Sequence, residues 1–304
     1  MIVMLGSHAV NHRINGFREK PVDYDVLLPV SEINNFLSRW EKIISCVPSS
    51  GSKYHAVVIE HGKKIHIEME MLGGRPSAEI LYNYVLNDNE TDIIDDILYP
   101  SLNFLFMLKM SHRYKKNSIH FEKTRSDILR MREYGGTITD KLYPVLRARE
   151  KDTYINKKFS LNKKKDEFFV DNVPYLYDHD TIHLAVARGS RPAYMEFQKP
   201  DQEVMCSKLM FDALPFEQRL NAVLEEAYVL ALERAIIPHN TDPQKAYGIA
   251  LRAICTGTTS GWFREFAWEN YQTALDMYDD EFVHKFTLAL KDGKIAPYDL
   301  PRHE

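Results

Sequence analysis

Apolar and polar positions follow two different periods in the front part of the chain. Residues 1–5 (MIVML) and 22–29 (VDYDVLLP) are short apolar runs typical of buried strands. Residues 54–71 alternate with period two on both sides of an HGKK turn, which predicts a β-hairpin. Residues 32–44 carry apolar side chains at helical spacing after Ser31, a candidate N-cap. This order predicts strands that alternate with helices.

The pattern becomes helical after the hairpin. Apolar side chains recur at i, i+3, i+4 and i+7, and prolines stand at two of the expected helix starts. The predicted helices are 76–86, 100–116, 121–134, 181–187, 215–237, 243–255 and 280–292. We therefore expect an α/β (α+β) protein, with a small mixed β-sheet in residues 1–150 and a mostly α-helical domain in residues 151–304.

Composition narrows the class of protein. The 304 residues are 44% hydrophobic, which indicates a globular chain with a sizeable core, and a net charge of −4 gives no overall attraction to nucleic acid. Cys46, Cys206 and Cys255 are too far apart for a close-spaced zinc site or a disulfide framework, which favours a reducing compartment. No secretory signal and no bilayer-spanning apolar run is recognisable, so we expect a cytoplasmic protein with no membrane partner.

Paired acids interrupt the second predicted strand. Asp23 and Asp25 are two residues apart, so both side chains leave the same face of that strand. In the hairpin, His66, Glu68 and Glu70 share one face. If the two strands are neighbours, three or more carboxylates converge, as a hard divalent cation with open positions for phosphate oxygens requires. Acids also occur on exposed edge strands, but the apolar residues that follow favour a central strand.

The first predicted strand ends at Gly6 and Ser7. Glycine lets the backbone approach a phosphate group closely. The serine hydroxyl and the next backbone N–H groups can donate hydrogen bonds to that phosphate if a helix begins there. The turn and the acids together predict a site for metal-bound phosphate.

These motifs resemble a known family. The Gly-Ser strand end (MLGSHAV), the Asp-x-Asp strand (VDYDVLL) and the later acidic strand (HIEME) look like the nucleotidyltransferase fold of the DNA polymerase β superfamily. The resemblance covers roughly the first half of the chain. It implies transfer of a nucleotidyl group from an NTP, with Mg²⁺ (or Mn²⁺) bound by Asp23 and Asp25 and with Glu68 completing the triad as a metal ligand or a base. Gly6 and Ser7 would hold the triphosphate.

Further residues enter through the same resemblance. Glu70 competes with Glu68 as the third acid, and Glu68 is preferred because it lies nearer the middle of its strand. These proteins direct a lysine or arginine toward the triphosphate from a following helix, where Lys109 and Lys123 are the candidates. Asp127 would be structural. The acceptor stays open between a small molecule, a protein side chain and an RNA end, and so does the oligomeric state.

Histidines later in the chain suggest a second hypothesis. Their order resembles the His…His-Asp…Asp pattern of metal-dependent HD phosphohydrolases, whose ligands activate water against a phosphate. The candidate ligands are His112, His120, His179, Asp180 and His183. The final acid would be Asp212, Glu225 or Glu226. The favoured interpretation is instead that Asp178 or Asp180 caps a helix on which His183 packs, or that these residues contact substrate. A third hypothesis is a non-catalytic nucleotide-binding module.

Overall fold

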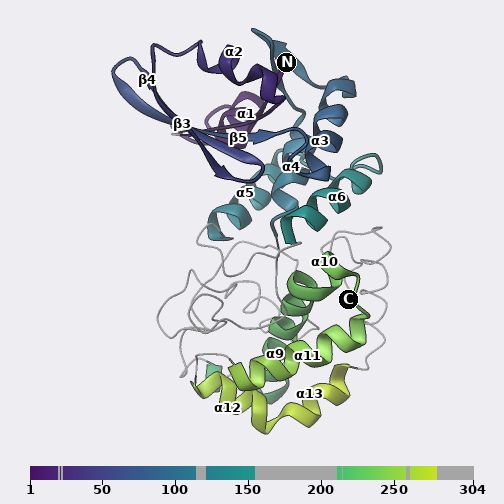
Figure 1. Ribbon diagram of the computed structural model, residues 1–304. Coiled ribbons are helices and arrows are strands. Elements are labelled where there is room, and N and C mark those ends of the chain that lie inside the picture. The colour runs from purple at the N-terminus through teal and green to yellow at the C-terminus, as the bar shows by residue number, and fades with distance from the viewer. Residues whose placement is uncertain are drawn as a thin grey trace. The chain divides into compact units, whose positions relative to one another are not determined.

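The structure is a computed structural model of the chain. It describes residues 1–19, 21, 23–113, 121–154, 211–213, 215–257 and 261–278 (Figure 1). The chain forms two compact units, one of Met1–Met110 and Met131–Asp152 and the other of Ser111–Arg130 and Thr153–Glu304. The segment Ser111–Arg130, which the sequence-based division assigns to the first domain, thus groups with the second unit.

The first unit is built on a mixed sheet of seven strands, in the order β3-β4-β5-β2-β1-β7-β6. β1 pairs in parallel with β7 and β2 in parallel with β5, while the other neighbours are antiparallel. The strands are β1 Ile2–Leu5, β2 Asp23–Leu28, β3 Lys42–Ser50, β4 Lys53–Glu60, β5 Lys63–Met71, β6 Asp92–Ile94 and β7 Ile97–Tyr99. Together with the helices of the chain, this sheet confirms the predicted α+β class.

The apolar runs at the start of the chain form the two central strands. All four residues of β1 are buried, and Val26, Leu27 and Leu28 of β2 are at most 1% exposed. β1 and β2 are antiparallel neighbours with β5 and β7 on their outer sides. The paired acids at the start of β2 therefore lie on a central strand, as the sequence predicts, and not on an exposed edge.

Helices of the first unit cover this sheet and leave one end of it free. They are α1 Gly6–Arg13, α2 Ile33–Leu37, α3 Pro76–Asn87, α4 Leu102–Met110 and all but the last two residues of α6 Tyr143–Tyr154, while α5 Phe121–Glu133 is divided between the two units. α3 begins with Pro76, and the Asp152 carboxylate accepts a hydrogen bond from the Ser77 N–H at 2.7 Å, which satisfies one free donor of the first turn. In Figure 1 the end of the sheet formed by β3 and β4 projects away from α3 and α4.

The β4–β5 hairpin confirms the period-two prediction. The strands meet at His61 and Gly62, whose φ angles are 48° and 72°, and this left-handed backbone explains the glycine in the turn. On β5 the odd-numbered Ile67 and Met69 are fully buried, while Glu68 between them is exposed. The two faces of this strand therefore differ in polarity as the alternation predicts.

The helix predicted over 32–44 is wrong in its second half. A 3-10 turn, Val30–Glu32, leads into α2, which ends at Leu37, and β3 begins at Lys42. The β-branched residues of 43–47 favour an extended chain, and this segment pairs with β4 along its length. The short β6–β7 hairpin was not predicted either, because strands of three residues carry almost no periodic signal.

The described part of the second unit is helical. Its helices are α9 Phe216–Ala231, a π-helical turn Leu232–Ile236, α10 Ile237–His239, α11 Pro243–Gly257, α12 Gly261–Glu269 and α13 Tyr271–Tyr278. They confirm the helices predicted over 215–237 and 243–255. An aromatic cluster forms part of the core, where the Phe211 ring lies 5.0 Å from Trp262 and 5.3 Å from Phe266. The helices predicted over 181–187 and 280–292 lie outside the described residues.

Candidate active site on the acidic sheet face

The turn from β1 into α1 is shaped by its contact with Asp25. Gly6 opens α1 with φ +59°, and a Cβ atom at this position would lie 1.9 Å from the Asp25 carboxylate oxygen Oδ2. Only glycine leaves room for the carboxylate here, and glycine also tolerates the left-handed backbone. Ser7 follows as the second residue of α1 and is half-buried. The predicted turn therefore lies directly against one of the predicted metal ligands.

Strand register brings the three predicted acids onto one surface, which we call the acidic face. Asp25 lies opposite Glu68 across the parallel β2–β5 pair, and Asp23 lies opposite His66. Paired residues on neighbouring strands point to the same side, and their strands are about 4.8 Å apart. On its other side Asp25 lies opposite Leu5, the last residue before the Gly-Ser turn. The Gly-Ser turn and the acidic strand β5, which are far apart in the sequence, thus both adjoin Asp25.

The carboxylates of the acidic face repel one another. Burial raises the pKa of Asp25 to about 6, and the negative charges of Asp23 and Glu68 contribute to this rise. The positive charges of Lys109 and Lys53 act in the opposite direction. A divalent cation would relieve this repulsion, and carboxylate oxygens are the ligands that Mg²⁺ prefers. The donor set of the acidic face therefore fits a magnesium ion.

The preference for Glu68 over Glu70 has a structural basis. Glu70 is 6% exposed and forms a two-pronged ion pair with Arg149 of α6, with N–O distances of 2.5 and 2.7 Å. Burial raises the pKa of Glu70, but the hydrogen bonds and charge of Arg149 outweigh this, and the pKa is lowered. Arg149 also lies 3.3 Å from the Ser77 hydroxyl. Glu70 is therefore a structural residue with both oxygens occupied.

Glu68 is free of such a network. Its side chain is 55% exposed, and its only described ion pair is with Lys53, at 3.4 Å. An exposed pair of this kind contributes about 0–1 kcal/mol and is easily exchanged for a cation. Lys53 is a residue that the sequence analysis missed. The alternation of β4 could have indicated it, because Lys53 and His55 occupy the same face of that strand.

The other predicted residues have different outcomes. Lys109, on α4, is close enough for its charge to lower the pKa of Asp25. Lys123 lies on α5, in the segment that groups with the second unit, and so does the buried Asp127. His112 follows α4 in that same segment. Outside the described residues lie His120, His179, Asp180 and His183.

No metal site is already assembled in the described parts of the chain: no group of three or more His, Cys, Asp or Glu side chains is arranged there to hold an ion. The acids of the acidic face share a surface, but their oxygens would have to converge by side-chain rotation.

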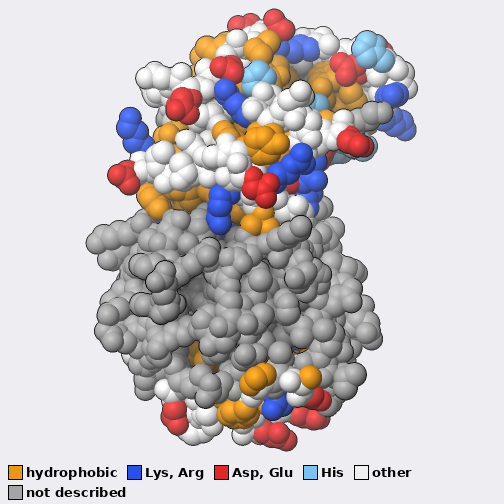
Figure 2. Space-filling view, turned by 180° about the vertical axis from the view of Figure 1, so that it is seen from behind, with side chains coloured by type: hydrophobic (Ala, Val, Ile, Leu, Met, Phe, Trp, Pro, Cys, Tyr) orange, Lys and Arg blue, Asp and Glu red, His pale blue; other side chains and the backbone are white. Residues whose placement is uncertain are grey.

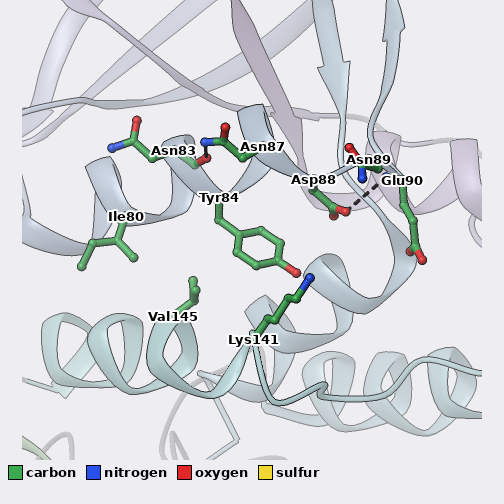
Figure 3. Close-up of a pocket in the computed structure, with 9 residues that line it drawn as sticks. All are labelled: Ile80, Asn83, Tyr84, Asn87, Asp88, Asn89, Glu90, Lys141 and Val145. Carbon is green, nitrogen blue, oxygen red and sulfur yellow. Dashed lines mark hydrogen bonds between the residues drawn. The ribbon is translucent and has the colours of Figure 1, made fainter.

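A separate groove lies beside α3 and holds none of the predicted site residues. It has a volume of about 780 Å³, and Figure 3 shows Lys141 reaching toward Tyr84 at its centre. Burial, followed by the charges of Asp88 and Glu90, raises the pKa of Tyr84. The lining residues are Ile80, Asn83, Tyr84, Asn87, Asp88, Asn89, Glu90, Lys141 and Val145. Its two acids, Asp88 and Glu90, do not lie beside a glycine turn that opens a helix, so this groove lacks the combination found on the acidic face.

The fold and site define an α+β protein with a cluster of acids beside a glycine turn. The chain belongs to the family described as "Domain of unknown function (DUF7275)", which matches residues 104–287, more than half of its length. The matched range begins within α4, so Gly6 and the acids of β2 and β5 lie outside it. No curated protein and no solved structure matches the chain. Among the described helices, none has the length and apolar character needed to cross a membrane.

The raised pKa of Asp25 predicts a stability change with pH in metal-free protein. Its pKa is about 6 in the folded state and about 3.8 in the unfolded state, so the folded state binds more protons between these values. The free energy of unfolding should therefore fall as pH rises from about 4 to 6, by up to roughly 3 kcal/mol. Asp25→Asn should lack this decrease and be more stable than wild type at pH 7. Urea unfolding at pH 4.5 and 7.5 measures the effect, and equal pH dependence of both proteins would contradict it.

Proposed function

We propose that the protein is a metal-dependent nucleotidyltransferase that moves an NMP from an NTP to an acceptor hydroxyl and releases pyrophosphate. One observation carries the proposal: the carboxylate of Asp25 lies against Gly6 and on the same sheet rung as Glu68. A phosphate held at the start of α1 would therefore lie beside the acids that bind a cation. Mg²⁺ held by Asp23, Asp25 and Glu68 would neutralise charge on the transferred phosphate.

The remaining roles follow from position. The Gly6-Ser7 turn would bind the triphosphate through the N-terminus of α1, where backbone N–H groups are free and no acidic side chain occupies the first turn. Lys109, whose charge acts on Asp25, would orient the same phosphates. The acceptor oxygen would attack the α-phosphorus as the bond to pyrophosphate breaks, and the exposed Glu68 would accept the hydroxyl proton. We place this reaction in the cytoplasm, because three cysteines far apart in the sequence favour a reducing compartment.

The test is transfer of label from each α-³²P NTP in the presence of Mg²⁺ and a cell extract. Wild type should label an acceptor, and Asp25→Asn should be slower by about a hundredfold or more, because one charge-stabilising group is lost. Glu60→Gln is the matched control. Glu60 lies on the same hairpin, but it is opposite Lys63 in the strand register and on the other face of the sheet. Absence of transfer by wild type with all four NTPs would overturn the proposal. Equal transfer by wild type and Asp25→Asn would show that the acidic face is not the active site.

A further inference from the structure

Two histidines that no proposed role uses face each other beside the acids. His66 Nδ1 and His55 Nε2 are 3.2 Å apart, and one of these ring nitrogens donates to the other. The rings come from neighbouring antiparallel strands, and His55 lies opposite Glu68 while His66 lies opposite Asp23. Both imidazoles are therefore on the acidic face, next to the acids on the side of β4. Figure 2 shows histidine side chains at the surface of this projecting part of the sheet.

The distance between the two nitrogens matches shared coordination of one ion. In tetrahedral zinc sites the Zn–N distance is 2.0–2.1 Å, so two imidazole nitrogens on one ion are separated by about 3.3–3.4 Å. The observed separation of 3.2 Å is close to this value, and each ring would have to turn so that its lone pair points at the ion, with the proton between the nitrogens displaced by the metal. Imidazole is a ligand for transition metals and not for Mg²⁺, which takes oxygen donors.

A carboxylate is available to support the pair. The Asp23 side chain is exposed and makes no hydrogen bond or ion pair with any residue that the structure describes, so it can join without breaking a contact, whereas Glu68 would first have to leave Lys53, at 3.4 Å. Asp23 lies directly across from His66 on the next strand. Since the described residues contain no ready group of three ligands, Asp23 would join by side-chain rotation and water would complete the coordination.

We propose that His55 and His66 form a binding site for a divalent transition metal ion of the zinc type, with Asp23 as the third protein ligand. This site shares Asp23 with the magnesium site proposed above but takes two histidines in place of Asp25 and Glu68, and it does not depend on nucleotidyl transfer. It has one consequence that does rest on the proposed function. Because Asp23 belongs to both ligand sets, a bound zinc ion would hold this carboxylate away from magnesium and inhibit transfer.

The test is titration of tag-free, metal-free protein with Zn²⁺ against a chromogenic zinc indicator. Wild type should bind one Zn²⁺, and His55→Gln and His66→Gln should each weaken the affinity at least tenfold. His61→Gln is the matched control, because His61 is an exposed histidine of the same hairpin that lies at the turn, away from the pair. Asp25→Asn, which should slow transfer by about a hundredfold or more, should leave zinc binding unchanged.

Three results would overturn the metal site. They are no zinc binding by wild type, equal binding by His66→Gln and wild type, or loss of binding in Asp25→Asn with retention in both histidine variants. Because His66 is exposed and His55 is only half-buried, the histidine variants should keep the wild-type circular dichroism spectrum and melting temperature. Imidazole ¹⁵N shifts of the wild-type protein give an independent readout: zinc should shift a nitrogen in each of two rings, and shifts in none or in only one would also overturn the site.

Discussion

Replacing Glu70 with glutamine is expected to lower the free energy of unfolding by about 3–5 kcal/mol, whereas the same change at Glu68 should alter it by less than about 1 kcal/mol. The two acids are on the same face of β5, two residues apart. Glu70 is buried with Arg149, and removing its charge leaves a buried guanidinium without compensation. Glu68 is exposed, and its pair with Lys53 is readily replaced by water.

Urea denaturation of both variants without metal measures this difference. Transfer activity should be lost in Glu68→Gln and kept in Glu70→Gln, because only Glu68→Gln removes a proposed metal ligand. Transfer by Glu70→Gln should be measured at a temperature where the variant is folded. Arg149→Met should destabilise the protein to a similar extent, since it leaves the Glu70 charge buried and unpaired. Equal stability of Glu70→Gln and Glu68→Gln would show that the Arg149 pair is not structural.

Replacing Gly6 with alanine is expected to have the largest effect on the site. The added Cβ would lie 1.9 Å from Asp25 Oδ2, so either the start of α1 or the Asp25 carboxylate must move. The left-handed φ of +59° adds about 1–2 kcal/mol of backbone strain for any residue with a Cβ. We expect transfer to fall at least about a hundredfold, since displacement of a charge-stabilising group is comparable to its removal.

Gly62→Ala separates the two causes. Gly62 has φ +72°, and no atom lies within 4 Å of the place that a Cβ would occupy, so this variant carries the backbone strain without the contact. It should lose about 1–2 kcal/mol of stability and keep full transfer activity. In an Asp25→Ala background, Gly6→Ala should cost less stability than in wild type, because the clashing oxygen is gone. Similar losses of stability and activity in Gly6→Ala and Gly62→Ala would contradict the proposed contact.

Local sequence patterns were sufficient for the central strands and for the shared face of Asp23 and Asp25. A period of two puts residues i and i+2 on one side of any strand, and the apolar run after Asp25 requires burial on both sides. The hairpin turn at His61 and Gly62 was also predictable, because a left-handed turn selects glycine locally. These features depend only on residues within one element or one turn.

Other features depended on contacts between distant segments. Glu68 and Glu70 have the same position in the alternation, and only Arg149, 79 residues from Glu70, makes one of them structural. The His55–His66 contact depends on the register between β4 and β5. β3 is a strand because its backbone forms hydrogen bonds with β4. The sequence by itself determined which residues share a face of each strand. Tertiary structure decided which strands adjoin and which acids are neutralised, because burial and pairing depend on groups that the chain brings together only when it folds.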